Sequence, residues 1–265
     1  MCNEAFGETP FSEQCTTLRQ AGYQGIELAP FTLAPEPLQI SAAQRAEYRR
    51  IMQAETLQFV GLHWLMVSGA GYHLTTPDPA LRARSWQYIR ELIDLSADLG
   101  EKTVLVFGSP KQRSSTGGLT AAATRHFMDG FRDVAAQAGD RGVTLLVEAL
   151  GKSQTDVVNT LSEAAAIVAE IGHPAVQTMF DVHNTESETD SHAKLIDRYL
   201  PIIRHVHVQE MDGRYPGMGS YDFRSLLQKL TALNYQGWVS LEAFDFSPGA
   251  SEIARRSLAY LKENE

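Results

Sequence analysis

Short apolar runs alternate with longer amphipathic stretches along most of this chain. Seven of the runs are rich in Val, Ile, Leu and Phe, a composition that predicts strands covered on both faces. These runs occupy 24–30, 58–66, 102–109, 143–150, 176–183, 203–210 and 238–244. A weaker run at 1–6 predicts an eighth strand.

The stretches between the runs place apolar residues at three- and four-residue steps, which predicts helices packed on one face. The clearest of them, 78–100, begins after Thr-Thr-Pro and stops at Gly100, as a helix commonly does. The other predicted helices occupy 10–22, 120–142, 160–174, 223–237 and 249–265.

A strand followed by a helix, repeated eight times in 265 residues, predicts an α/β fold of the (β/α)8 TIM barrel type. We expect one domain that spans 1–265, because no linker or low-complexity segment interrupts the pattern. A doubly wound open sheet is the competing architecture. The chain has no Gly-x-Gly-x-x-Gly after any predicted strand, which favours the barrel.

Composition and charge exclude several classes of function. The chain is 43% hydrophobic and 21% charged, which is typical of a soluble globular protein, and no apolar run is long enough to span a membrane. No secretory signal is visible, and Cys2 and Cys15 lack a metal or redox spacing, so we expect a reduced, cytoplasmic protein. A formal charge of −9 without a Lys/Arg cluster argues against nucleic acid as a partner.

Polar residues gather at the predicted carboxyl ends of the strands, where the chemistry of a TIM barrel lies. They are Glu27, His63, Glu148, Asp181, His183, His205, His207, Glu210 and Glu242. Each has a structural interpretation when taken alone. An Asp after a strand often caps the next helix, and Glu27 could pair with a cation inside a barrel layer.

Four of these residues come from consecutive strands, namely Glu148, Asp181, His207 and Glu242. Three carboxylates that converge without a cation would repel one another, and some would be protonated. No Lys or Arg occupies these strand ends in the predicted arrangement. The set therefore predicts one divalent metal ion. Oxygen ligands with one imidazole favour Mn²⁺ or Mg²⁺, and Co²⁺ is a further candidate. Zn²⁺ usually takes more nitrogen or sulfur ligands.

The segments "LLVEAL", "MFDVHN", "HVHVQE" and "VSLEAF" resemble, in this order, the metal site of the xylose-isomerase-like TIM-barrel superfamily. Within it, the chain resembles ketose 3-epimerases and hydroxypyruvate isomerases most closely. The resemblance covers essentially the whole chain, including "AGYQGIELAP" and "LNYQGWVSLEAF". It implies that the four residues above are the metal ligands and that Glu148 and Glu242 are also the catalytic acid–base pair.

The implied activity is that of a metal-dependent sugar isomerase or epimerase in carbohydrate metabolism. Proton transfer would pass through a metal-bound enediolate of a sugar, keto-sugar or sugar acid. The expected partner is thus a small carbohydrate or keto-acid substrate, and a homo-oligomer is left open. The residues expected to bind substrate are His63, Trp64, Gln154, His183 and Arg214.

Some substrate positions depart from the family pattern. His183 follows Asp181 by two residues, where the family has a His three residues on. Gln154 stands where the family has Glu, and Arg214 is displaced by about one residue. These departures argue against the specificity of a ketohexose 3-epimerase.

Three other functions compete with the isomerase. A metal-dependent lyase or dehydratase would begin with the same proton removal, and the sequence barely separates it from an isomerase. A non-catalytic sugar-binding barrel would not need a second carboxylate opposite the first. An endonuclease of the same superfamily would need more histidines than these strand ends supply, and the negative charge opposes DNA.

Overall fold

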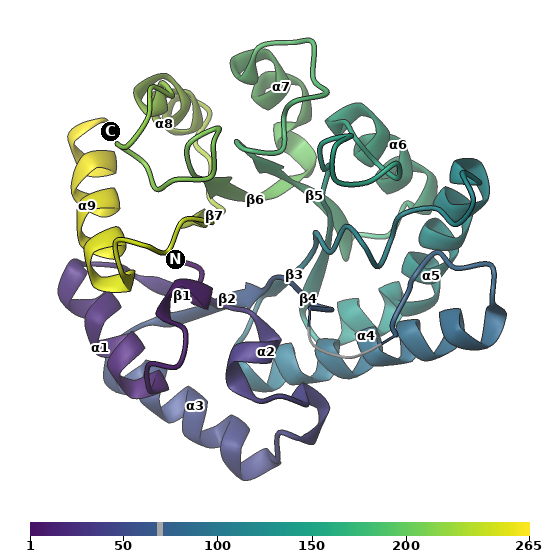
Figure 1. Cartoon of the computed structure of the whole chain (residues 1–265), viewed down its shortest axis with the longest axis horizontal. Helices are drawn as coiled ribbons and strands as arrows, with labels where there is room; N and C mark the ends of the chain where they lie inside the picture. The colour runs from purple at the N-terminus through teal and green to yellow at the C-terminus, as the bar shows by residue number, and fades with distance from the viewer. Residues whose placement is uncertain (68–70) are drawn as a thin grey trace.

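The computed structural model describes residues 1–67 and 71–265. Its seven strands form one parallel sheet in sequence order, which curls into a nearly closed barrel surrounded by helices (Figure 1). The strands are β1 (Gly25–Leu28), β2 (Gln58–Leu62), β3 (Thr103–Phe107), β4 (Val143–Val147), β5 (Val176–Asp181), β6 (Ile203–Val208) and β7 (Trp238–Leu241). The predicted TIM-barrel fold is thus confirmed.

The helices that cover the barrel are α1 (Phe11–Ala21), α2 (Pro30–Leu33), α3 (Ala42–Ala54), α4 (Pro79–Leu99), α5 (Thr120–Asp140), α6 (Leu161–Ile171), α7 (His192–Tyr199), α8 (Phe223–Ala232) and α9 (Ala250–Glu263). Short 3₁₀ helices are η1 (Glu4–Phe6), η2 (Pro37–Gln39) and η3 (Leu200–Ile202). The pattern did not predict α2, α3 or α7. Helix α3 buries only Met52, so its apolar face is weak, and its start is instead set by a capping box at Ser41. No helix among the described residues is both long and apolar enough to cross a membrane.

The N-terminal segment closes the barrel in place of a full eighth strand. Cys2 forms a single parallel bridge with Glu27. The Cys2 amide donates to the Leu241 carbonyl at 2.8 Å, and the Glu27 amide donates to the Met1 carbonyl at 3.0 Å. Through these hydrogen bonds the N-terminal segment bridges β7 and β1, and Figure 1 shows the N-terminus near both strands. The prediction of a strand over 1–6 is wrong beyond Cys2, because Asn3 takes an αR backbone and η1 follows.

The barrel interior has an apolar part and a polar part. Side chains of one parity on the strands form an apolar cluster that consists of Val60, Val104, Val106, Leu146 and Met179. Nearer the carboxyl ends of the strands, Glu27, His205 and His207 are fully buried. All seven strands end two to four residues before the predicted runs do, so several of the polar residues stand where the sheet opens.

Candidate metal centre and active site

Four strands deliver the predicted metal ligands to one place. Glu148 follows β4, Asp181 is the last residue of β5, His207 lies in β6, and Glu242 follows β7. All four are buried, and Asp181 and His207 are register partners in neighbouring strands. One donor atom each of Glu148, Asp181 and His207 lie within 4.8 Å of one another. Glu242 joins the group because its Oε2 lies 3.1 Å from His207 Nδ1.

Hydrogen bonds from side-chain amides orient the two carboxylates of β4 and β5. The Asn184 amide donates to Glu148 Oε1 at 3.0 Å and to Asp181 Oδ2 at 2.9 Å. Gln209 donates to Asp181 Oδ1 at 3.1 Å. Gln154 in turn donates to Asn184 Oδ1 at 2.6 Å. The sequence analysis missed Asn184 and Gln209, although both stand within three residues of a predicted ligand.

The imidazole of His207 lies between two carboxylates. Its Nδ1 faces Glu242 and the other predicted ligands, whereas its Nε2 lies 3.0 Å from Glu27 Oε1. The second oxygen of Glu27 lies 2.8 Å from His205 Nε2. A carboxylate on the far nitrogen fixes the orientation of a ligand histidine and raises its basicity. Glu27 would act on His207 in this way, and His205 pairs with the second oxygen of Glu27.

The pKa values of the two glutamates shift in opposite directions in this buried setting. Burial, together with the charges of Asp181 and Glu242, raises the pKa of Glu148 well above its usual range. Burial also acts to raise the pKa of Glu242, but the charge of His207 and its hydrogen bond lower it overall. A divalent cation would relieve the repulsion among the three carboxylates. The donor set of three carboxylates and one imidazole nitrogen fits such an ion.

One arginine lies beside this centre, which corrects the expectation that no Lys or Arg occupies the strand ends. Arg113 is 1% exposed, and its guanidinium donates to the carbonyls of Phe107 at 2.8 Å and Glu148 at 2.7 Å. It also donates to the Val158 carbonyl at 3.1 Å. The loop residue is therefore a buried brace for the backbone at the ends of β3 and β4, not a solvated cation.

A cavity of about 350 Å³ lies over the centre. Its lining includes the predicted residues His63, Trp64, Glu148, Gln154 and Glu242, together with Gly108, Lys111, Asn184 and Phe244. Adjacent residues of a strand normally face opposite sides, yet His63 and Trp64 both reach this cavity. The reason is the left-handed backbone of Trp64, whose φ of 48° turns the chain where β2 has ended.

Two predicted substrate residues lie outside the lining of this cavity. The ring of His183 packs edge-on against Phe244 at a centroid distance of 5.1 Å. The Arg214 guanidinium pairs with Asp212 through contacts of 2.8 and 2.7 Å, and its side chain is 38% exposed. Phe244 lines the cavity, and its amide donates to the carbonyl of Gly213, the residue before Arg214, at 2.7 Å. His183 nevertheless contacts the centre through its backbone, because its amide donates to Asp181 Oδ1 at 2.7 Å.

A larger cavity of about 1030 Å³ opens at the opposite, amino ends of the strands. Its lining includes Arg49, Lys102, Arg204 and Trp238, and it contains none of the predicted ligands. We therefore assign the candidate active site to the smaller cavity, because titratable groups converge there.

Comparison with known proteins extends these observations to the whole chain. A family model described as xylose isomerase-like TIM barrel matches residues 15–264. The ketose 3-epimerase of Arthrobacter globiformis is 26% identical over 185 residues, which are 69% of this chain and 63% of that protein. The 3-dehydro-D-guloside 4-epimerase of Escherichia coli (strain K12) is 24% identical over 270 residues, covering 98% of this chain and 97% of that protein.

Among solved structures, a D-psicose 3-epimerase crystallised in the presence of D-fructose superposes with a TM-score of 0.86. The match covers 99% of this chain and 97% of that one at 22% sequence identity. Likeness at this identity shows the shared fold, which is the nearly closed α/β barrel described above.

Proposed function

Because the chain belongs to the xylose isomerase-like TIM barrel family, we propose that it is a divalent-metal-dependent isomerase or epimerase. Its substrate would be a small sugar, keto-sugar or sugar acid. The observation that carries this proposal is the convergence of Glu148, Asp181, His207 and Glu242 beneath a cavity of about 350 Å³. The names of the relatives, a ketose 3-epimerase and a 3-dehydro-D-guloside 4-epimerase, support the same class of reaction.

The residues that would hold the ion are Glu148, Asp181, Glu242 and the Nδ1 atom of His207. Mn²⁺ or Mg²⁺ suits this set best, because oxygen donors outnumber nitrogen. When bound, the ion supplies Lewis acidity, which polarises a substrate carbonyl and makes the neighbouring C–H more acidic.

Proton transfer falls to the two glutamates. Glu148 follows β4 and Glu242 follows β7, three strands further round the barrel, and both line the cavity. One carboxylate removes a proton from one face of the substrate carbon, and the other returns a proton to the opposite face. This sequence inverts the carbon and gives epimerisation. Return of the proton to the adjacent carbon gives isomerisation between aldose and ketose.

Substrate selection would depend on the cavity-lining residues that are not predicted metal ligands. A volume of about 350 Å³ is at the lower end of ligand pockets, which favours a monosaccharide or smaller molecule. Trp64 and Phe244 stack with a centroid distance of 6.1 Å and offer an apolar wall to the C–H groups of a sugar. Gln154 and Lys111 offer hydrogen-bond donors for hydroxyl or carboxylate oxygens.

Solvent exchange tests this proposal directly. The protein, stripped of metal and then loaded with Mn²⁺ or Mg²⁺, is incubated in D₂O with ketohexoses, ketopentoses, hydroxypyruvate and sugar acids. We expect deuterium beside the carbonyl of one substrate class, together with its epimer or isomer, only in the loaded protein. Loss of water from the substrate would instead identify a lyase. Tight metal binding without exchange into any substrate would identify a binding protein and overturn the proposal.

A further inference from the structure

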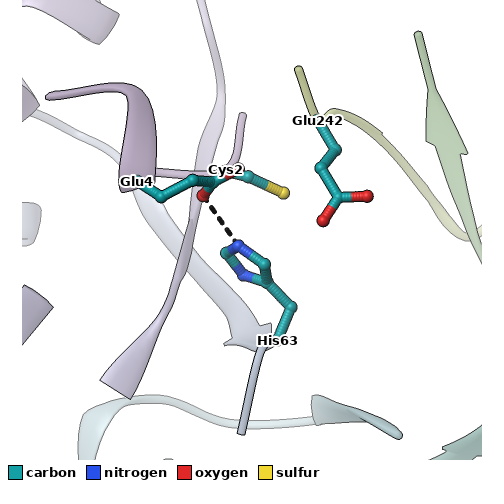
Figure 2. Close-up of side chains that lie close together, drawn as sticks. All are labelled: Cys2, Glu4, His63 and Glu242. Carbon is teal, nitrogen blue, oxygen red and sulfur yellow. Dashed lines mark hydrogen bonds and ion pairs between the residues drawn. The ribbon is translucent and has the colours of Figure 1, made fainter. Parts of the chain in front are cut away.

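A second group of side chains of metal-ligating types lies beside the candidate centre. That first centre, formed by Glu148, Asp181, His207 and Glu242, is called the oxygen-rich centre below. Figure 2 shows Cys2, Glu4, His63 and Glu242 converging from the N-terminal segment, η1 and the ends of β2 and β7. One donor atom from each lies within 4.8 Å of the other three. All four residues are buried, with exposed fractions of 1%, 6%, 0% and 3%.

The hydrogen bonds inside this group leave two potential metal-ligand atoms, Glu4 Oε1 and His63 Nδ1, without a partner among the described residues. Glu4 Oε2 lies 2.7 Å from His63 Nε2, whereas Glu4 Oε1 is buried and has no hydrogen-bond partner among the described residues. The other nitrogen of His63, Nδ1, has no hydrogen bond either and lies 3.7 Å from Glu27 Oε1. An orphaned carboxylate oxygen in a protein interior is unfavourable unless a cation or proton satisfies it.

A neighbouring group with similar residue types lacks this unused capacity. Cys2, Glu27 and His207 also offer atoms within 4.8 Å of one another. However, both oxygens of Glu27 are already paired, one with His205 and one with His207. Of these two groups, only the one that contains Glu4 and His63 therefore has a carboxylate oxygen without a hydrogen-bond partner.

We propose that Cys2, Glu4, His63 and Glu242 form a second cation site that selects a thiophilic divalent ion of the zinc class. A thiolate, an imidazole and two carboxylates are a tetrahedral zinc set, whereas the neighbouring centre is rich in oxygen and suits a harder ion. Glu242 is common to both groups and has two oxygens, one of which faces His207. The proposal does not depend on the reaction catalysed at the oxygen-rich centre.

An ion in the second site would hold the N-terminal segment, which closes the barrel, against the ends of neighbouring strands. Cys2 and Glu4 belong to the segment that lies between β7 and β1, and His63 follows β2. A bound ion would join this segment to two strand ends and stabilise the fold by mass action. The metal ligand is the thiolate, so binding must displace the proton of the Cys2 thiol.

Cobalt spectroscopy tests this site independently of turnover. Metal-free protein is titrated with Co²⁺, because thiolate ligation gives an intense near-ultraviolet charge-transfer band that carboxylates and imidazoles do not give. We expect the band to saturate, bound cobalt to reach two ions per chain, and added Zn²⁺ to remove the band. Cys2→Ser should lose the band and keep one cobalt. Cys15→Ser, the control at the chain's other buried cysteine, should keep the band.

Further measurements distinguish failure of this second site from failure of the proposed oxygen-rich centre. Asp181→Asn, which weakens the oxygen-rich centre, should leave the thiolate band in place. Absence of the band in the wild type at saturating Co²⁺, or its persistence in Cys2→Ser, overturns the second site. Should Cys2→Ser fail to fold, zinc X-ray absorption on Cys15→Ser decides instead. One sulfur at about 2.3 Å supports the proposal, and a shell of only nitrogen and oxygen refutes it.

Discussion

A Cβ atom on Gly108 would lie 2.0 Å from Glu148 Oε2. Gly108 follows β3 and Glu148 follows β4, directly after the register pair Phe107 and Val147. The carboxylate therefore occupies the volume that any other side chain at position 108 would fill. Glycine is needed here for close approach, not for an unusual backbone angle.

Gly108→Ala should displace the Glu148 carboxylate from the metal centre. We expect turnover to fall by roughly 10²-fold, since a displacement near 1 Å at a reacting group has this effect. Mn²⁺ affinity, measured by calorimetry, should weaken in parallel. The control is Gly139→Ala in α5, where the nearest atom is a side-chain carbon of His173 at 3.2 Å. Unchanged Mn²⁺ affinity in Gly108→Ala would show that the carboxylate is not a ligand.

Glu148→Gln and Glu242→Gln should each lower kcat by on the order of 10² or more, because each removes one proton-transfer group. Metal content must be measured in the same samples, since both residues are also proposed ligands. Glu210→Gln is the matched control. Glu210 is buried just after β6. Its carboxylate accepts hydrogen bonds from the backbone amides of Gly217 and Tyr221 and so holds the loop that follows β6. Normal turnover in either active-site variant with full metal would refute the acid–base assignment.

Arg113→Met should destabilise the fold by about 3 kcal/mol or more, because three buried carbonyls lose their donor and each orphaned group costs roughly 1 to 3 kcal/mol. Denaturant unfolding measures this change. Lys111→Met, at an exposed position of the same loop, should stay within about 0.5 kcal/mol. Equal stabilities of the two variants would contradict the role assigned to Arg113.

Arg214→Ala and Asp212→Ala distinguish a substrate contact from a loop contact. The two side chains form an exposed ion pair, so removal of either partner should affect stability to a similar, small extent. If the guanidinium reaches the substrate during turnover, only Arg214→Ala raises KM, and Asp212→Ala leaves it unchanged or lowers it. Identical kinetics in both variants would restrict Arg214 to its loop.

Asp156→Asn should change the acid stability of the protein. Asp156 is exposed, and a slight desolvation acts to raise its pKa, but hydrogen bonds from Ser115 and Thr120 lower it to about 2. A depressed carboxyl pKa stabilises the fold above the unfolded value, about 3.9, and this contribution is lost as pH falls through the folded value. Thermal melts should therefore show the variant as less stable above about pH 4, with the difference vanishing near pH 2. A difference that is constant with pH would contradict this account.

The order of apolar and amphipathic segments was sufficient to predict the barrel. Strands buried on both faces and helices buried on one face have different periods, and both periods are local properties of the chain. The same reasoning located Glu148, Asp181, His207 and Glu242, because parallel strands in a barrel present their carboxyl ends at one rim. That these residues meet around His207 follows from the observed register, in which Asp181 pairs with His207.

Other features depended on contacts between distant segments. Sequence spacing gave no sign that Cys2 and Glu4 lie beside His63, since only closure of the barrel between β7 and β1 brings them there. Whether Arg113 is solvated or buried likewise depends on whether its loop folds over the strand ends. Local periodicity determines which elements form. The burial and pairing of loop and terminal side chains are set by the tertiary packing of those elements, because each contact joins residues far apart in the chain.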